Sequence, residues 1–407
     1  MTIRRQPEDF LVDERVSAAF EAALRDGPAR DTPFVVYRLT KTSLTTPDAV
    51  QRLARTLRSR SGDVGYAGLK DKHARTSQIV SIGPLTRFDA PATIHGPGWS
   101  AARRGWVSQP VTSKAIEGNR FTIVVRGLTA EASAEMDSRA AMLTVPGGTD
   151  LLVVNYFGDQ RFGSARHGKG FVARRLIEGD FESALRLAIG TPARKDVGAH
   201  RTFTRLCATH WGRWEEILNR SPRCPELAAV SRLAAGGTFR DAFDALPEFF
   251  RLMCVEAYQS HLWNATARRL AERAASSAPE GQRAVARTDD AFGEMVFPAA
   301  WAVGEAWRDL IVPLLAPKTK PVDPWAGAVG EVLAEEGIAL EQLKIPGLRR
   351  PFFGEAPRTL FVRAEGFVLG ERETDDLDAG GRRFKRVVSF DLARGAYATV
   401  VLRALGQ

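Results

Sequence analysis

The order in which strand and helix patterns follow one another along the chain constrains its fold more than any other feature. Patterns typical of strands fill much of the first 155 residues and return near the end, whereas helical patterns dominate from about residue 164 to 345. A middle segment of different character between two strand-rich flanks is typical of a domain inserted into a sheet domain. We therefore predict that residues 1–155 and 346–407 form one sheet domain and that residues 156–345 are inserted into it.

Local patterns predict where single elements lie. Runs of apolar and β-branched residues predict strands at 34–39, 78–82, 121–125, 151–157, 359–362, 387–390 and 399–402. Residues 180–189 predict a helix with an acidic cap at Asp180 that ends at Gly190. Residues 247–275 predict a longer buried helix or a pair of helices. Together these patterns indicate a mixed fold of strands and helices.

The charge balance indicates the kind of partner. The 407 residues carry a formal net charge of +9, and 44% of them are hydrophobic and 26% charged, which is ordinary for a soluble globular protein apart from the basic excess. Arginine supplies most of that excess, and its guanidinium makes planar, bidentate contacts with phosphate. The balance favours a polyanionic partner such as RNA, although cationic charge also serves solubility alone.

One predicted helix carries both a core face and a basic face. We expect it to begin at Thr46, Pro47 and Asp48, which we interpret as an N-cap, a helix-opening proline and a first-turn acid. Apolar residues at helical spacing predict its core face: Val50, Leu53, Ala54 and Leu57. A basic stripe elsewhere on the helix is either a solvated face or a contact to RNA: Arg52, Arg55 and Arg58.

The sequence lacks the signatures of several classes of protein. Three cysteines, Cys207, Cys224 and Cys254, are too few and too widely spaced for a disulfide framework, which predicts reduced thiols in a cytoplasmic protein. No CxxC or HxxxH spacing indicates a metal site, and no GxGxxG or P-loop pattern indicates a nucleotide cofactor. The best apolar run, 310–316, is short and interrupted by Pro313. We therefore expect no membrane segment, no metal and no organic cofactor.

One loop sets a carboxylate between two cations. In the glycine-containing segment 65–78, Asp71 stands between Lys70 and Lys72. Cationic neighbours favour the ionised form of a carboxylate, which is then available as a nucleophile at neutral pH. The two lysines also suit contact with phosphate or a structural role. The alternative is a surface turn with a local ion pair, which is common and weak.

The same loop resembles the catalytic motif of the tRNA pseudouridine synthase D (TruD) family. In that family the aspartate of an AGxKDK-type segment attacks the target nucleotide, and Asp71 stands at the matching position. Further matching segments extend from the N-terminus to the last residues, and the resemblance is weakest across the helical middle. It implies that Asp71 is a catalytic residue and that Lys70 and Lys72 lie near the substrate. His73, two residues further on, is either a phosphate contact or a bystander.

The segment 7–14, PEDFLVDE, resembles the PEDFxVxE motif of the family, which has a basic residue upstream. The family usually shows lysine there, whereas this chain has Arg4. The resemblance implies that Arg4 is the cation paired with the catalytic aspartate, and Arg5 is a competing candidate. An arginine holds a carboxylate in two parallel charge-assisted hydrogen bonds, which keeps the carboxylate ionised and oriented.

Two further motifs imply a pocket for the target base. The segment 118–121, GNRF, resembles the GNxF motif and implies that Phe121 stacks on the base while Asn119 organises the pocket. The alternative is a turn followed by a strand with Phe121 in the core. The segment 155–163, NYFGDQRFG, resembles the NYFGxQRFG motif and implies substrate contacts. Its candidate substrate-binding residues are Asn155, Phe157, Gln160 and Arg161. The alternative is a hinge whose aromatic residues pack together.

The C-terminal segments also match. Residues 347–350 and 389–403 resemble the GxRR and FxLPxGxYATxxLR motifs, with Ala393 where the family usually has proline. Their arginines are either phosphate or structural contacts, and an ion-paired sheet edge is the alternative: Arg349, Arg350 and Arg403.

Taken together, the resemblance implies a mixed α/β (α+β) fold. It comprises the pseudouridine-synthase catalytic domain, with a mostly antiparallel sheet and flanking helices, interrupted by a largely helical TruD insertion domain. The implied activity is isomerisation of uridine 13 of tRNA to pseudouridine after base flipping, with tRNA as partner and no obligate protein partner. Whether the aspartate attacks the ribose or the base stays open. The alternatives are a noncatalytic RNA-binding or RNA-folding protein and a pseudouridine synthase that acts on another RNA site.

Overall fold

The computed structural model describes residues 2–84, 90–163, 165, 168–193 and 196–407. The chain divides into two compact units. Unit 1 comprises Met1–Val153 and Val362–Gln407, and unit 2 comprises Val154–Phe361. Unit 1 is therefore built from two segments that are separated in sequence by the whole of unit 2.

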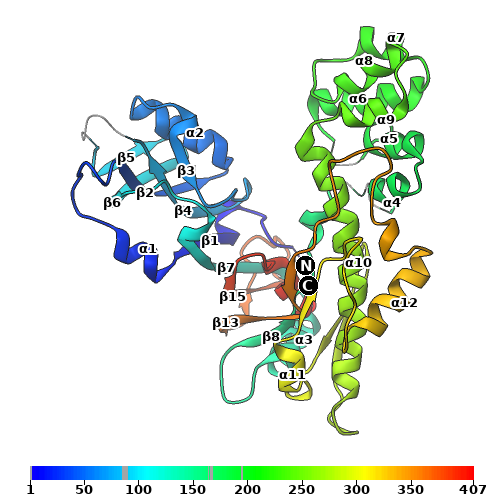
Figure 1. Cartoon of the computed structure of the whole chain (residues 1–407). Coiled ribbons are helices and arrows are strands. Elements are labelled where there is room, and N and C mark those ends of the chain that lie inside the picture. Colours follow the sequence, from blue (N-terminus) through cyan, green and yellow to red (C-terminus); the bar gives the residue numbers. More distant parts are fainter. Residues whose placement is uncertain (1, 85–89, 164, 166–167, 194–195) are drawn as a thin grey trace. The chain divides into compact units, whose positions relative to one another are not determined.

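An eleven-stranded sheet dominates the described residues of unit 1 (Figure 1). Its main order is β5-β6-β2-β4-β1-β7-β15-β13-β8, with β3 beside β4 and β14 beside β15. The strands are β1 (Phe10–Val16), β2 (Phe34–Thr42), β3 (Val64–Tyr66), β4 (Arg75–Ile82), β5 (Thr93–Gly96), β6 (Trp99–Val107), β7 (Ile116–Leu128), β8 (Leu151–Val154), β13 (Phe361–Leu369), β14 (Glu373–Thr374) and β15 (Phe384–Ala393). β1 and β4 are parallel, whereas β7 is antiparallel to both of its neighbours, β1 and β15. The predicted mixed fold with a mostly antiparallel sheet is confirmed.

Helices flank this sheet. The alternation of side chains along β2 explains how the hydrophobic core between β2 and one of these helices forms. The helices of unit 1 are α1 (Ala18–Ala23), α2 (Thr46–Thr56), α3 (Ala130–Leu143) and α13 (Ala398–Ala404). Successive strand residues point to opposite faces, so Tyr37 and Leu39 of β2 lie on one side, where they pack with Val50 and Leu53 of α2. The predicted core face of α2 and the predicted strands at 34–39, 78–82, 121–125 and 387–390 are confirmed.

The start of α2 lies one residue from the predicted position. Thr45, not Thr46, is the N-cap, and its hydroxyl accepts a hydrogen bond from the Asp48 backbone N–H. Thr46 is therefore the first helical residue. Its side chain is free of the capping role and takes part in the loop described below.

The prediction of a strand at 399–402 is wrong, because these residues form part of α13. The β-branched run there favours a strand locally. However, Ala398, Val401, Leu402 and Leu405 follow the spacing of one helix face, and all four are buried. Burial of that face outweighs the local preference of the β-branched residues.

The prediction of a strand from 151 to 157 is wrong beyond Val154, where β8 ends. Past this point the backbone finds partners outside the ladder: the Asn155 N–H donates to the Leu360 carbonyl, and the Phe157 N–H donates to Asn264 Oδ1. The predicted strand at 359–362 is likewise divided, because β12 (Pro357–Thr359) ends before Leu360 and β13 begins after it.

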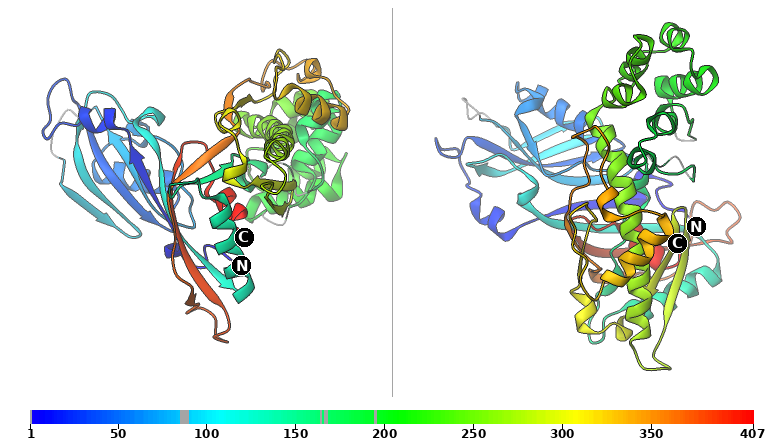
Figure 2. Two further views of the ribbon diagram at one scale, coloured as in Figure 1. Left: turned by 90° about the horizontal axis from the view of Figure 1, so that it is seen from below. Right: turned by 45° about the vertical axis from the view of Figure 1, so that its right-hand side comes forward.

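Unit 2 is largely helical and is organised around the long helix α10 (Glu248–Ser276) (Figure 2). Its other helices are α4 (Val172–Ile177), α5 (Phe181–Ile189), α6 (Gly198–His210), α7 (Trp214–Arg220), α8 (Leu227–Ala234), α9 (Phe239–Asp244), α11 (Glu305–Arg308) and α12 (Ala326–Glu336). It also contains two small antiparallel sheets of two strands: the hairpin of β9 (Val285–Asp290) with β10 (Gly293–Pro298), and the pair of β11 (Ile311–Pro313) with β12.

Two predictions about unit 2 are resolved. The predicted helix at 180–189 is confirmed as α5, with Asp180 as N-cap and Gly190 as C-cap. The segment 247–275 forms the single helix α10 rather than a pair.

Among the helices that the structure describes, none combines the length and the apolar character needed to cross a membrane.

Candidate active site

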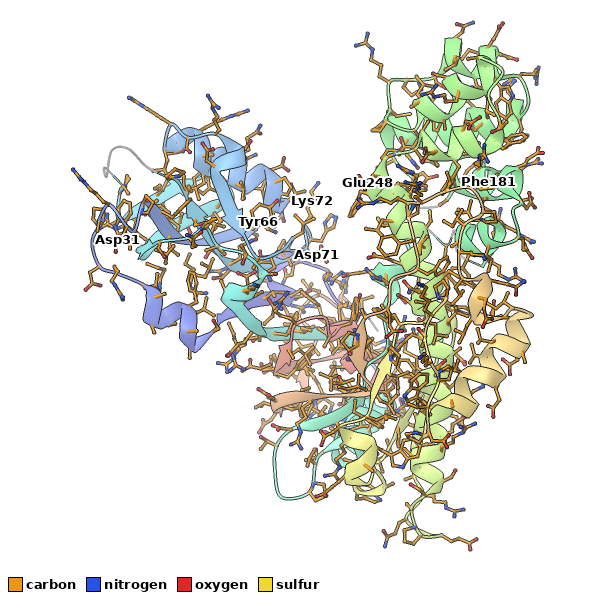
Figure 3. The ribbon with its side chains drawn as sticks, viewed as in Figure 1. Asp31, Tyr66, Asp71, Lys72, Phe181 and Glu248 are labelled. Carbon is orange, nitrogen blue, oxygen red and sulfur yellow. The ribbon has the colours of Figure 1, made fainter. Side chains whose placement is uncertain are left out.

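The loop between β3 and β4 carries Asp71 and is held by buried side chains (Figure 3). The Thr46 hydroxyl donates to Gln78 Oε1 at 3.0 Å and accepts from the Lys70 backbone N–H at 2.9 Å. Gln78 Nε2 donates to the Gly68 carbonyl at 3.3 Å. Thr46 and Gln78 are fully buried, so side chains from α2 and β4 replace the backbone pairing that the loop lacks. The loop is therefore anchored at Gly68 and Lys70, on the N-terminal side of Asp71.

Each carboxylate oxygen of Asp71 has a donor. Arg4 Nη1 lies 2.9 Å from Asp71 Oδ2, and the His73 backbone N–H donates to Oδ1 at 3.0 Å. The Arg4 guanidinium also lies over the Phe10 ring, 4.1 Å from its centroid. Burial lowers the pKa of Arg4, and the Asp71 charge opposes that shift. Arg4 thus forms the ion pair, whereas Arg5 donates to the Leu377 carbonyl at 3.5 Å.

The two lysines beside Asp71 differ sharply. Lys70 points inward, where its ammonium lies 2.8 Å from Glu14 Oε1 and donates to Asn119 Oδ1 at 2.7 Å. Glu14 is buried, and its other oxygen accepts from the Ile79 backbone N–H at 2.8 Å. Lys72 is exposed. Lys70 is therefore a structural contact of the site, while Lys72 is accessible to solvent (Figure 3).

The contact with Lys70 fixes the orientation of the Asn119 amide. An ammonium group donates hydrogen bonds and accepts none, so the Asn119 atom that faces it is the oxygen. The amide nitrogen then points the other way as a donor. Asn119 and Phe121 are two residues apart on β7, so both side chains project from the same face of the sheet.

Phe121 packs in an aromatic cluster of three strands. Its ring contacts Phe10 of β1 at a centroid distance of 6.2 Å and Phe390 of β15 at 5.7 Å. Only 9% of Phe121 is exposed. The ring thus lies in the core, as the alternative given for this segment in the sequence analysis expects.

Lys41 is a member of this site that the motifs did not reveal. It is fully buried on β2, and its ammonium donates to the Asp71 backbone carbonyl at 2.6 Å. Burial lowers the pKa of Lys41 to about 8, with a contribution from Lys70, and the Asp71 charge opposes the shift. The period of two along a strand could have revealed Lys41, because it lies on the same face of β2 as the apolar residues Tyr37 and Leu39. A lysine on the core face of a strand requires a buried partner.

The NYFG segment lies in unit 2, where most of its residues pack internally. Asn155 and Phe157 are buried, and Arg358 donates to the Asn155 carbonyl and side-chain oxygens and lies 3.9 Å from the Phe157 ring centroid. Arg161 pairs with Glu256 at 2.7 Å, and Gln160 is exposed. The segment is therefore a packed part of unit 2 in which Asp159 and Gln160 are exposed and Arg161 is half-buried.

The arginines of the C-terminal motifs belong to different units. Arg349 and Arg350 are exposed in unit 2, whereas Arg403 lies in α13 of unit 1 and donates to the Gln407 carbonyl at 3.0 Å. None of these three arginines takes part in the ion pairs of Asp391, which lies on the interior strand β15 of the unit 1 sheet. That carboxylate binds Arg15 at 2.9 Å and Arg120 at 2.8 Å.

The described residues contain no group of three histidine, cysteine, aspartate or glutamate side chains placed to hold a metal ion. The polar network at the site comprises two carboxylates, Asp71 and Glu14, and three cations, Arg4, Lys41 and Lys70. Such a site suits nucleophilic attack by an ionised aspartate close to a polyanion.

Comparison with known proteins places the chain among the pseudouridine synthases. The model of the family tRNA pseudouridine synthase D (TruD) matches residues 1–405, and the chain belongs to this family. It is 29% identical over 411 residues to the tRNA pseudouridine synthase D of Aquifex aeolicus, with 99% of this chain and 97% of that protein covered. It is 32% identical over 386 residues to a probable tRNA pseudouridine synthase D of Methanopyrus kandleri, with 92% and 85% covered.

A solved structure is also similar over nearly the whole chain. The crystal structure of the putative tRNA pseudouridine synthase D (TruD) from Methanosarcina mazei matches with a TM-score of 0.70 and 26% identity. The match covers 99% of this chain and 92% of that one. Both units of the present chain therefore fall within the shared fold.

Proposed function

We propose that this protein isomerises uridine 13 of tRNA to pseudouridine by an aspartate-dependent mechanism with base flipping. Membership of the family and the names of its relatives support a tRNA substrate. The single observation that carries the mechanism is the Arg4–Asp71 pair in its anchored loop. A tRNA substrate also fits the cytoplasmic location predicted from the sequence.

Asp71 is the proposed nucleophile. Arg4 and the His73 N–H hold its two oxygens, so the carboxylate is kept in one orientation. The reaction breaks the bond between N1 of uracil and C1′ of ribose and forms a bond between C5 and C1′. A proton leaves C5 and one is gained at N1, so the overall change is an isomerisation that consumes no cofactor. Attack by Asp71 at the ribose and attack at the base both satisfy this balance.

Asn119 and Phe121 are the proposed pocket residues. The amide nitrogen of Asn119 is a donor, as the contact with Lys70 requires, and therefore suits a carbonyl oxygen of uracil. Cytosine carries an amino group, itself a donor, in place of the uracil O4, so a contact of Asn119 at that position would favour uracil. The Phe121 ring beside it offers stacking to a flipped base, an interaction of roughly 1–3 kcal/mol per base.

Unit 2 is proposed to act as the TruD insertion domain and to bind RNA. Of the NYFG segment, Gln160 and Arg161 are accessible enough to contact tRNA directly, whereas Asn155 and Phe157 are buried and would act by holding their neighbours. The +9 net charge contributes affinity for the phosphate backbone, so tRNA binding should weaken as salt rises.

The proposal is tested by incubating the purified protein with an unmodified tRNA transcript that contains uridine 13 and mapping pseudouridine by mass spectrometry. We expect product at position 13 with the wild type and none with a transcript that carries cytidine there. Asp71→Asn should abolish product and leave the Kd for tRNA nearly unchanged, because the substitution keeps the size of the side chain and removes its charge. Substantial turnover in that variant would show that Asp71 is not the nucleophile.

The same experiment distinguishes the two alternatives. Tight tRNA binding without pseudouridine in any transcript supports a noncatalytic RNA-binding or RNA-folding protein. Pseudouridine at another position supports a synthase with a different site. Mapping pseudouridine across total RNA from cells that lack the protein then identifies the RNA that has lost it.

A further inference from the structure

Lys41 occupies a position where an apolar side chain could be buried at a lower cost in folding free energy. It is fully buried on the core face of β2, in line with Tyr37 and Leu39. Its partners in the strand register are Thr76 of β4 and Trp99 of β6, neither of which carries a charge. Burial of an ammonium among such neighbours disfavours folding unless a specific partner compensates. The lysine must therefore contribute something other than stability.

The partner of Lys41 is the main chain of the proposed nucleophile. Its ammonium donates to the Asp71 carbonyl at 2.6 Å, while Arg4 binds the Asp71 carboxylate at 2.9 Å. Two cations thus hold the same residue, one through its backbone and the other through its side chain. Lys41 comes from β2 and Arg4 from the segment before β1, so the two contacts fix Asp71 from different elements.

The charged groups near Lys41 come from the loop after β3, from β1 and from the segment before β1. The loop after β3 contributes Asp71 and Lys70, β1 contributes Glu14 through its contact with Lys70, and Arg4 lies on the far side of Asp71. Thr46, at the start of α2, is neutral. Asp71 is thus the nearest compensating anion for Lys41, since Glu14 is already bound to Lys70.

We propose that Lys41 is a positioning residue for the isomerisation, which fixes the Asp71 backbone and whose positive charge is needed for the full rate. This inference rests on the function proposed above. Lys41 touches no reacting atom and acts only through Asp71.

The proposal makes activity and stability respond to pH in opposite ways. The pKa of Lys41 is lowered by burial from 10.5 to about 8, so its charge is lost as the pH rises through about 8 and the rate should fall. Between about 8 and 10.5 the unfolded chain binds more protons at this position than the folded chain does, so this group makes stability rise with pH. Removal of the ammonium should therefore cost activity without costing stability.

The test compares Lys41→Met with wild type and with Lys114→Met, which alters an exposed lysine of unit 1. We would measure the single-turnover rate of pseudouridine formation between pH 6.5 and 9.5, the Kd for tRNA, and the thermal unfolding midpoint. In Lys41→Met at neutral pH we expect a rate about 10- to 100-fold lower, as for a misplaced reacting group. The Kd should be unchanged, the midpoint equal or higher, and the fall in rate near pH 8 absent. Lys114→Met should match wild type.

Three results would overturn the proposal. An unchanged rate shows that the contact has no role in catalysis. If the rate falls and the thermal unfolding midpoint of the variant falls as well, the role of Lys41 is purely structural. A fall in rate near pH 8 that persists in Lys41→Met assigns that titration to another group.

A readout without activity separates this inference from the proposed function. The ε-carbon NMR signal that disappears in Lys41→Met identifies Lys41, and its titration midpoint should lie near 8 and move lower in Asp71→Asn, because the compensating anion is gone. A midpoint near 10.5, or one insensitive to Asp71→Asn, contradicts the coupling. If the wild type modifies no tRNA, the proposed function fails while this titration still decides whether Lys41 is coupled to Asp71.

Discussion

Two arginines of unit 1 bind aspartates in opposite charge environments. Arg126 of β7 is 3% exposed and contacts Asp9 at 2.8 Å, Asp375 at 2.7 Å and Asp376 at 2.8 Å. Burial alone would lower its pKa, but hydrogen bonds to the three aspartates outweigh burial and raise it. Arg4 has a single carboxylate partner, Asp71, and its pKa is lowered because burial prevails.

The difference shows how a structural charge cluster is distinguished from a site. Around Arg126, three carboxylates bind one buried guanidinium and tie the turn before β1 to β7 and to the segment after β14, and Lys385 binds the exposed member, Asp376. Around Asp71, three cations share two carboxylates, Asp71 and Glu14, and 22% of the Arg4 and Asp71 side chains stays exposed. A local excess of buried cations with an opening to solvent suits a polyanionic substrate.

The largest expected effect is on stability, from Arg126→Met. Removal of the cation leaves Asp9 and Asp375 buried without compensation, which should lower the free energy of unfolding by about 3–5 kcal/mol. Urea unfolding measures this. The matched control is Arg120→Met, which removes a pair with Asp391 from a side chain that is 64% exposed and should cost about 0–1 kcal/mol. Equal losses in the two variants would show that the Arg126 cluster is no stronger than a surface pair.

An intermediate effect, on rate rather than stability, is expected for Arg4→Met. The loss of a hydrogen bond to a charged group is worth roughly 1.5–3 kcal/mol, so the single-turnover rate should fall about 10- to 100-fold. Arg4→Lys should keep most of the rate, since lysine also supplies a cation and is the usual residue in the family. A wild-type rate in Arg4→Met would show that Asp71 needs no cation at its carboxylate.

The smallest effect is expected for Lys72→Met. Lys72 is exposed beside Asp71, so its substitution should weaken tRNA binding slightly and reduce the slope of log K against log salt by about 1. The rate at saturating tRNA should not change. Fluorescence anisotropy at several salt concentrations measures the slope, and an unaltered slope would show that Lys72 contacts no phosphate.

The sequence predicted those parts of the molecule that depend on local patterns or on long motifs. The core face of α2 follows from helical spacing, and the Asp71 loop follows from its charges and its motif. The motifs do not contain Lys41, because its role depends on strand pairing that brings β2 beside β4 and its preceding loop. The helix α13 was predicted as a strand for a related reason, since burial outweighed the local preference of its β-branched residues.

The position of β7 between β1 and β15 also sets when the site is complete during synthesis. Phe121 packs on Phe10 from early in the chain, but its other neighbour, Phe390, is made 269 residues after it. At 5–20 residues per second the ribosome needs roughly 15 to 55 s for that interval. Until then one edge of β7 has no partner and is open to wrong pairing. The aromatic cluster of Phe10, Phe121 and Phe390 therefore cannot be complete in the nascent protein before β15 has been synthesised.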